Sequence, residues 1–471
     1  MVATMAESQL PRTSYDDLPY GAATHPTTHP DRLATIATLF GAAPPRVATC
    51  RVLELGCARG MNLLPMAVEL PNASFLGIDL SAVQIADGQK IVEQLGLDNL
   101  ELRHASILDV DEDCGQFDYV ICHGVFAWVP LEVQQKILQI CAGQLTDQGV
   151  AQVSYNTYPG WHLRGLVREM LLYHSSGVAD PTLRTAAARA LLDFLAEAAG
   201  EHSPYGRILN EERALLARLP DYYVFHEHLE SNNQPMYFHE FAARAAESGL
   251  QYLGDADPAT MGHFSFPANV QEVLRRLSGS VVQAEQYMDF LRNRMFRQSL
   301  LMRDGVRLSR TVQPDVLRAL RVASPARVDE TAELAPDETR FVAGRTRESL
   351  TTKDPILRGA LLRLGDAWPA SLPYDDLVAD LSAGLDTDAE RVAGLLAPSL
   401  LRLYLSSRLL ELHVSPPAFV TAPDGRPAAS PLARLQAGAS SEVTNLRHET
   451  EGAPRGGGVP PERRGGHAKD R

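Results

Sequence analysis

The hydrophobic pattern of the chain becomes regular at a short, nearly uninterrupted apolar run that leads into glycines. Residues 51–55 form this run, and Gly56 and Gly60 bracket the turn that follows. So few polar positions are typical of a parallel strand whose two faces are both covered by helices. A second run, residues 75–79, ends in Asp79. The pattern predicts two buried strands connected by a glycine turn and a helix.

Strands and helices alternate in the next hundred residues. Ser81 is expected to cap a helix that continues to Leu95 and ends at Gly96. Further on, the pattern predicts a helix over residues 130–142 and strands over residues 100–104, 117–122 and 150–154. This alternation predicts an α/β fold, a Rossmann-like doubly wound parallel sheet.

The region after residue 175 is expected to be helical at first. Residues 182–199 and 208–219 are alanine- and leucine-rich and predict a helical insertion. A helix over residues 238–248 and a strand over residues 250–253 are expected to complete the sheet, which should close near residue 265.

One long helix is predicted over residues 281–302, with an apolar stripe at helical spacing. Arg292, Arg294 and Arg297 lie within it. They are expected to form a solvated basic face or, alternatively, a docking surface.

In the C-terminal third the hydrophobic pattern changes, and it predicts three helices followed by a strand. The segments are residues 355–364, 374–381, 389–403 and 409–414. This order predicts a mainly α, winged-helix-like domain. An acidic opening of the third helix, residues 386–390, argues against a DNA reader. The glycine-rich tail is expected to be disordered.

The glycine turn narrows the choice of ligand. It reads G-x-x-x-G, with Ala58 where the middle glycine of a dinucleotide site would stand. Without that glycine the turn offers no cradle for a pyrophosphate, so NAD and FAD are disfavoured. Glu54 at the first strand tip can meet an ammonium, and Asp79 can accept hydrogen bonds from ribose hydroxyls. The combination favours S-adenosylmethionine.

Residues 45–160 resemble a class I S-adenosylmethionine-dependent methyltransferase, at Glu54, Gly56, Gly60, Asp79 and residues 117–118. Segments elsewhere are similar to bacterial methyltransferases with a methyltransferase regulatory domain: residues 14–20, 28–33, 155–161, 225–230 and 237–241. That group includes protein lysine methyltransferases. The resemblance implies a seven-stranded sheet and these cofactor-binding residues: Tyr20, Glu54, Gly56, Cys57, Ala58, Gly60, Asp79, Leu80, Ser106, Ile107 and His123.

The acceptor pocket is expected above the fourth and fifth strands. Candidate catalytic residues there are His123, Trp128 and Tyr158, within an aromatic group that also includes Phe126, Tyr155 and Trp161. His123 is a candidate general base or substrate-orienting group, and a structural loop histidine is an equal alternative. Aromatic faces could hold an aliphatic or cationic side chain. The chain lacks the Asn-Pro-Pro-Tyr motif of planar-nitrogen enzymes, which disfavours adenine, cytosine and glutamine acceptors.

The composition of the chain narrows the classes of molecule that it is expected to bind. A net charge of −14 argues against nucleic acid and favours a basic protein or peptide substrate. No apolar run reaches the ~18 residues of a membrane span, and five cysteines without C-x-x-C argue against disulfides and structural zinc. We expect a cytoplasmic enzyme with no metal site, and a homodimer is one expected assembly. A small-molecule O- or N-methyltransferase and a non-catalytic cofactor-binding regulator remain alternatives.

The expected organisation has six parts. They are an N-terminal lid segment (1–44), a cofactor-binding core (45–175), the helical insertion (176–220), a regulatory domain that completes the sheet (221–305), the C-terminal domain (306–450) and the tail (451–471).

Overall fold

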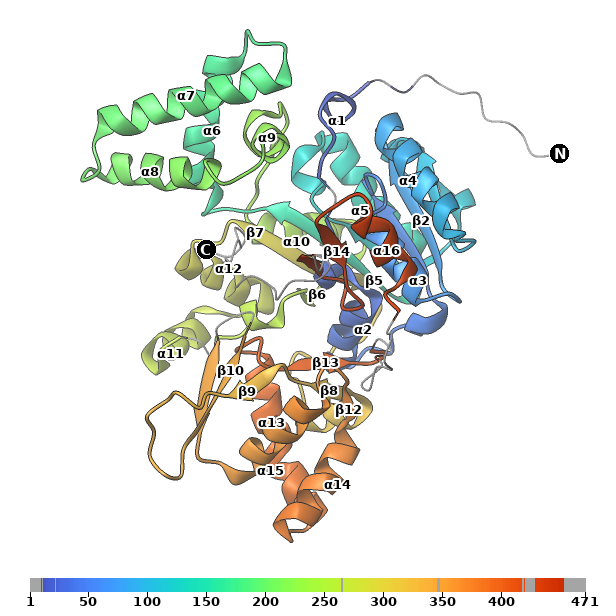
Figure 1. The fold of residues 1–471 in the computed structure, drawn as a ribbon, viewed down its shortest axis with the longest axis vertical. Helices are drawn as coiled ribbons and strands as arrows, with labels where there is room; N and C mark the ends of the chain where they lie inside the picture. Colours follow the sequence, from blue (N-terminus) through green and yellow to red (C-terminus); the bar gives the residue numbers. More distant parts are fainter. Residues whose placement is uncertain are drawn as a thin grey trace, which may run out of the picture.

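The computed structural model describes residues 10, 12–21, 23–263, 266–344, 348–416, 419 and 428–452. Its centre is a seven-stranded sheet of order β3-β2-β1-β4-β5-β7-β6 (Figure 1). The strands are β1 Arg51–Leu55, β2 Ser74–Asp79, β3 Leu100–His104, β4 Phe117–Cys122, β5 Leu145–Asn156, β6 Leu250–Asp255 and β7 Phe296–Arg303. The predicted seven-stranded α/β sheet is confirmed. It is mixed rather than wholly parallel, because β7 runs antiparallel to β5 and β6.

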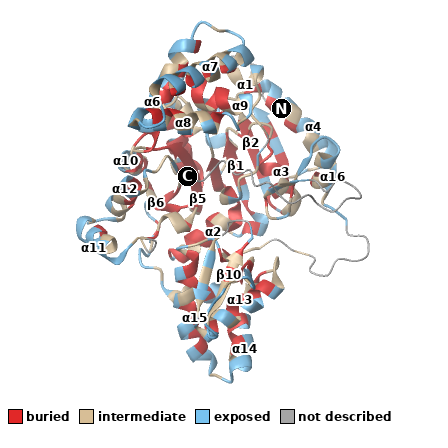
Figure 2. Cartoon of the chain, turned by 60° about the vertical axis from the view of Figure 1, so that its left-hand side comes forward, coloured by how far each residue is buried: buried red, intermediate tan, exposed pale blue. Residues whose placement is uncertain are grey.

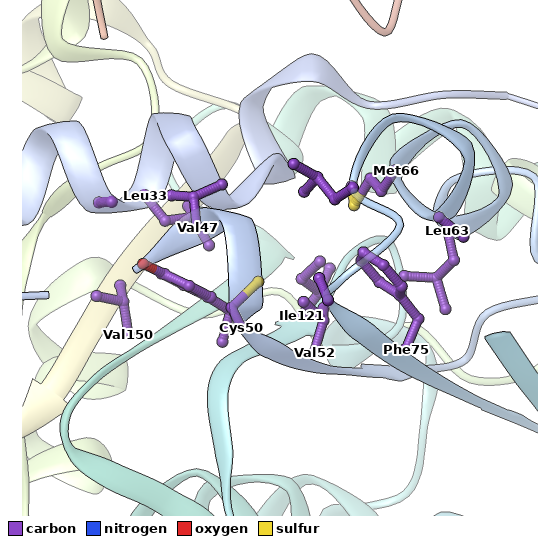
Figure 3. Packing of buried hydrophobic residues seen from close by; sticks show 14 of the residues in the cluster. Leu33, Val47, Cys50, Val52, Leu63, Met66, Phe75, Ile121 and Val150 are labelled. Carbon is purple, nitrogen blue, oxygen red and sulfur yellow. The ribbon is translucent and has the colours of Figure 1, made fainter. Parts of the chain in front are cut away.

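Helices cover both faces of this sheet. One face packs against α2 (Pro30–Leu39), α3 (Leu63–Glu69) and α4 (Ala82–Leu95), and the other packs against α5 (Leu131–Gln144) and α10 (Phe238–Glu247). Successive strand residues alternate between the two cores: Val52 belongs to the first and Leu53 to the second. Figure 3 shows Val52, Phe75 and Ile121 meeting Leu63 and Met66 in the first core, and Figure 2 shows the strands buried. Burial on both faces explains the continuous apolar runs in the sequence.

The local signals around α4 are confirmed to the residue. Ser81 Oγ accepts a hydrogen bond from the backbone N–H of Gln84 over 3.2 Å, and Gly96 ends the helix in the left-handed region at φ 62°. The Ser81 cap therefore starts the helix directly after β2, and Gly96 ends it before the chain returns to the sheet at β3.

The strand order reverses between β1 and β4: β2 and β3 lie on one side of β1, and β4, β5, β7 and β6 lie on the other. In open α/β sheets a crevice forms at this switch point, beyond the carboxyl ends of the strands. The tips of β1, β2 and β4 therefore define where a ligand site is expected.

Three further groups of elements surround the sheet. After β5, helices α6 (Trp161–Ser175), α7 (Pro181–Ala199) and α8 (Pro204–Leu216) share a separate core and project from one end of the molecule, followed by α9 (Asp221–Val224) (Figure 1). The N-terminal segment contains the short helix α1 (Ser14–Asp17). In the part of the chain described, no helix is both long and apolar enough to cross a membrane.

The C-terminal region forms its own core at the other end (Figure 1). Its helices are α13 Pro355–Ala367, α14 Tyr374–Leu385 and α15 Ala389–Tyr404, and its strands are β8 Arg321–Ala323, β9 Ala326–Val328, β10 Thr339–Ala343, β11 Ser349–Thr352, β12 Leu372–Pro373 and β13 Glu411–His413. The three predicted helices and the following strand are present. The winged-helix-like classification stays a prediction, and all but the first two residues of the 451–471 tail lie outside the described residues.

The prediction of one helix over residues 281–302 is wrong. Helix α12 (Val281–Arg292) ends at Asn293, which adopts a left-handed φ of 48°, and the chain turns into β7. The sheet therefore closes at Arg303, well beyond residue 265.

For Arg294 and Arg297, both interpretations of the basic residues in this segment are wrong as well. The Arg297 side chain is fully buried, with Nε 2.8 Å from Oδ2 of Asp289 and Nη2 2.9 Å from Oε2 of Glu285. Arg294 Nη2 lies 2.7 Å from Oδ2 of Asp255. These two arginines form ion pairs that connect α12, β7 and β6 inside the protein. They form neither a solvated face nor a docking surface.

Candidate functional site

A cavity of about 1840 Å³ opens at the carboxyl ends of β1, β2 and β4. It is bounded by the strand tips, the N-terminal segment, the helices after β5 and parts of the C-terminal region. The following predicted site residues line it: Tyr20, Glu54, Gly56, Cys57, Ala58, Asp79, Leu80, Ser106, Ile107, His123 and Trp128. The topological switch point and the cavity therefore coincide, as in other open α/β sheets.

The turn after β1 brings the backbone close to the cavity. Gly56 has φ 76°, and a Cβ there would lie 2.4 Å from Cγ2 of Val125, so no larger residue fits. The backbone N–H groups of Gly56 and Cys57 donate to the carbonyl of Ile78 over 2.8 and 3.1 Å. This ties the turn to the tip of β2. A ligand can approach the loop without meeting a side chain.

Asp79 is held by the loop that it faces. Its Oδ2 accepts a 2.8 Å hydrogen bond from the N–H of Ala58, and its Oδ1 accepts one of 2.8 Å from the N–H of Ser81. Each carboxylate oxygen keeps further acceptor capacity. Burial raises the pKa of this carboxyl. The fixed carboxylate can accept hydrogen bonds from a vicinal diol.

Glu54 is almost fully buried, with a 4% exposed fraction. Asn62 Nδ2 donates to its Oε1 over 2.7 Å, and its Oε2 has no hydrogen-bond partner within the described residues. Burial, which is the main cause, raises the pKa of the Glu54 carboxyl to about 8, and the negative charge of Asp79 adds to the effect. A buried acceptor of this kind is matched by a cation. The ammonium of an amino-acid ligand supplies one, so these residues fit the expected cofactor.

His123 follows β4 and also lines the cavity. Its ring lies 3.9 Å from that of His25, centroid to centroid, and its Nδ1 lies 3.3 Å from Nε2 of Gln152. The orientation of the Gln152 amide determines which ring nitrogen of His123 carries the proton. If the amide oxygen faces Nδ1, then Nδ1 carries the proton and Nε2 is the basic nitrogen; if the amide N–H faces Nδ1, then Nε2 carries the proton and is a donor. The geometry accommodates both the general-base and the substrate-orienting alternative.

The predicted aromatic group divides among three places. Trp128 and Trp161 both line the main cavity, with ring centroids 5.9 Å apart in an edge-to-face arrangement. Phe126 and Tyr155 are core residues. Tyr158 lines a separate surface cavity of about 740 Å³ and stacks on His162 at 4.0 Å, so its position does not support the expected catalytic role.

Gly60 also lies away from the cavity wall. Its carbonyl accepts hydrogen bonds that start α3, and a Cβ there would lie 2.9 Å from Leu102. Gly60 therefore shapes the turn instead of facing a ligand. Ser106 does line the cavity, where its Oγ accepts a 3.2 Å hydrogen bond from the N–H of Leu108.

The N-terminal segment crosses the mouth of the cavity. Asp16 Oδ1 accepts a 2.6 Å hydrogen bond from Oγ of Ser81, which anchors α1 at the start of α4. Tyr15 stacks on His226 at 4.3 Å, and Tyr20 packs edge-on to Tyr222 at 5.5 Å. Burial raises the pKa of the phenols of Tyr15 and Tyr20. The segment therefore lines the cavity and is tied to the strand tips, and its role as a lid stays a prediction.

Sequence reasoning missed several polar residues of the site, among them His25, Asn62 and His448. Asn62 lies between Gly60 and α3, and a polar residue next to the glycine turn was a usable signal. His448 lies 386 positions from Asn62 yet reaches it, and no local pattern indicates such a contact.

Two family models match the chain. Residues 47–174 match "Methyltransferase domain", and residues 220–303 match "Predicted methyltransferase regulatory domain". The second match includes β6 and β7, the strands that complete the sheet. It therefore covers a part of the fold that the catalytic sheet requires.

Relatives match over almost the whole chain. The Rickettsia prowazekii protein RP789 is 36% identical over 93% of this chain and 80% of its own length. RP028 of the same organism is 40% identical over 51% of this chain and 97% of its own. The solved structure of PKMT2 from Rickettsia typhi in complex with AdoHcy (S-adenosylhomocysteine) aligns with a TM-score of 0.83 and 32% identity, covering 93% of this chain and 86% of that one. The chain belongs to the S-adenosylmethionine-dependent methyltransferases that carry a methyltransferase regulatory domain.

Proposed function

We propose that this enzyme methylates a protein side chain, and that the acceptor is a lysine ε-nitrogen. The observation that carries the proposal is the extended similarity to Rickettsia typhi PKMT2, a protein lysine methyltransferase, over 93% of the chain. This span includes the insertion and the C-terminal region, which are the parts most suited to contact a macromolecule. A net charge of −14 favours a basic partner.

The size of the cavity supports a substrate beside the cofactor. About 1840 Å³ exceeds the ~300–1,000 Å³ of pockets that hold one small ligand. The same space is also lined by Trp128, Trp161 and Glu227. Aromatic faces and a carboxylate are the groups that hold an alkylammonium by packing, cation–π attraction and charge.

We assign the cofactor-binding roles residue by residue. Glu54 meets the ammonium of the methionine part, Asp79 meets the ribose hydroxyls, and Gly56, Cys57 and Ala58 supply close backbone contact. Leu80, Ser106 and Ile107 border the adenine, and Tyr20 covers the mouth. When bound, S-adenosylmethionine supplies a methyl group already activated by its sulfonium.

The remaining work of the protein is alignment and proton handling. The acceptor nitrogen must lose a proton before it can attack, and a neutral amine must face the methyl group in line. His123 is the candidate that accepts this proton or orients the amine, and Trp128 borders the acceptor. The lid segment and the buried strand tips exclude water from this space.

Labelled S-adenosylmethionine tests the substrate. The purified chain is incubated with methyl-labelled cofactor and a bacterial extract, and the labelled protein is hydrolysed and separated into amino acids. Methyl-lysine in the protein fraction is the expected result, and the Asp79→Ala variant should give less of it when the cofactor is limiting. Label confined to small molecules would instead support the biosynthetic alternative, and binding without any label would support the non-catalytic regulator. A homodimer and a cytoplasmic location stay predictions from the sequence.

A further inference from the structure

The last described part of the chain returns from the C-terminal domain to the catalytic sheet. We call residues 428–452 the return segment; it contains α16 (Pro431–Ala437), β14 (Glu442–Thr444) and β15 (Thr450–Gly452). Figure 1 shows α16 and β14 beside the sheet, and α16 contacts α3, the helix that follows the glycine turn. The segment therefore lies behind the cofactor loop even though it is distant in sequence.

His448 lies in the turn between β14 and β15 and points into the protein. It is 3% exposed, and its backbone has a left-handed φ of 59°. Its Nε2 lies 2.9 Å from Oδ1 of Asn62. Burial, together with the nearby His29 and His25, lowers the pKa of this imidazole well below its usual value. The ring is therefore neutral and carries one N–H.

Asn62 connects this ring to the cofactor site. Its Oδ1 also lies 2.9 Å from the backbone N–H of His25, which can only donate. This backbone donor fixes Oδ1 on this side of the amide, so Nδ2 donates to Oε1 of Glu54 over 2.7 Å and to Oγ1 of Thr28 over 3.0 Å. The tautomer of His448 follows: Nε2 carries the proton, and Nδ1 has no partner within the described residues.

This hydrogen-bond chain leaves one oxygen of Glu54 for a ligand. The contact with Asn62 occupies Oε1, and the unpartnered Oε2 lies at the cavity that Glu54 lines. We propose that His448 is a positioning residue of the cofactor site: through Asn62, the return segment holds Glu54 so that its free oxygen meets the ammonium of S-adenosylmethionine. This inference builds on the proposed cofactor roles and adds the C-terminal end of the chain to the site.

Two ligands separate positioning from general support of the fold. S-adenosylhomocysteine has the amino-acid part, whereas 5′-methylthioadenosine has the nucleoside but no ammonium. Binding of each to the full chain is measured by calorimetry for wild type, His448→Leu and His448→Gln. Leucine and glutamine are both unbranched at Cβ, so they tolerate the left-handed backbone about equally, but only glutamine can donate a hydrogen bond. Arg434→Ala, an exposed change on α16, is the control.

His448→Leu is expected to weaken binding of S-adenosylhomocysteine about two- to tenfold, the range for loss of one buried hydrogen bond, and to leave binding of 5′-methylthioadenosine unchanged. His448→Gln should recover most of the affinity, and Arg434→Ala should match wild type. Equal weakening for both ligands would overturn the inference, because it indicates a collapsed pocket. Unchanged affinity for both would overturn it as well. Failure of the wild-type chain to bind S-adenosylhomocysteine would instead reject the proposed cofactor roles themselves.

Discussion

Asp79 at the tip of β2 accepts a 2.8 Å hydrogen bond from the backbone N–H of Ala58 in the turn after β1. Two strands are thereby locked into one binding surface before any ligand arrives. A site arranged in advance loses less conformational entropy on binding than one that must be ordered. The first predictions concern this surface.

Replacing Asp79 by alanine should weaken binding of S-adenosylhomocysteine by about 1–3 kcal/mol, because the ribose hydroxyls lose a buried acceptor. Isothermal titration calorimetry measures the change. Asp98→Ala removes an exposed carboxylate from the same α/β unit and should bind as wild type does. Affinity that survives the Asp79 change would show that the ribose lies elsewhere.

Glu54 should make the ligand-free protein less stable as pH rises. Its pKa is about 8 in the folded state and 4.5 as a reference, so the folded state binds more protons between these values. The contribution of this group to the free energy of unfolding therefore falls as pH rises through that window. Glu54→Gln, which mimics the protonated form, should gain stability relative to wild type near pH 8 compared with pH 4.5. Denaturant unfolding at both values measures this difference, and a constant difference contradicts it.

Two glycines make a matched pair of tests. Gly56→Ala adds a Cβ that meets Val125 at 2.4 Å in a left-handed backbone, so it should destabilise the protein by roughly 1–3 kcal/mol and impair cofactor binding. Gly143→Ala places the same methyl group in open space on α5 and should be neutral or stabilising by up to ~1 kcal/mol. Thermal unfolding distinguishes the two. Equal effects would mean that the Gly56 turn is not constrained as described.

The buried Arg297 should be critical for the fold. Arg297→Met leaves Glu285 and Asp289 as unpaired buried carboxylates, which should cost about 3–5 kcal/mol. Arg303→Met on the same strand removes a half-exposed ion pair with Asp147 and should cost less than ~1 kcal/mol. The free energy of unfolding in urea measures both. A small loss for Arg297 would show that the carboxylates find other partners.

Local signals predicted the cofactor half of the molecule well. The bounds of β3, β4 and α4 follow from apolar runs and from caps that act within a few residues, such as Ser81 and Gly96. Glu54 and Asp79 were recognisable because parallel strand tips meet at one edge of a sheet. A polar residue at the end of an apolar run is therefore enough to identify a candidate ligand-binding residue in such a sheet.

Features that depend on distant partners were missed. The apolar stripe of α12 runs on through Met295, so periodicity alone gave no reason to end the helix at Asn293. From the sequence alone, Arg297 is expected at the surface; in the structure it is buried between Glu285 and Asp289. Tyr158 lies two residues after β5, but it lines the surface cavity between α6, α7 and α8. These outcomes are set by tertiary packing.

A crystal structure of the protein with S-adenosylhomocysteine tests the central claim most directly. The account predicts the ligand at the carboxyl ends of β1 and β2, with its ammonium within about 2.7–3.2 Å of a Glu54 oxygen and its ribose hydroxyls at that distance from Asp79. Its sulfur should face His123 and Trp128. A ligand bound elsewhere, or one whose amino-acid part points away from Glu54, would contradict the account.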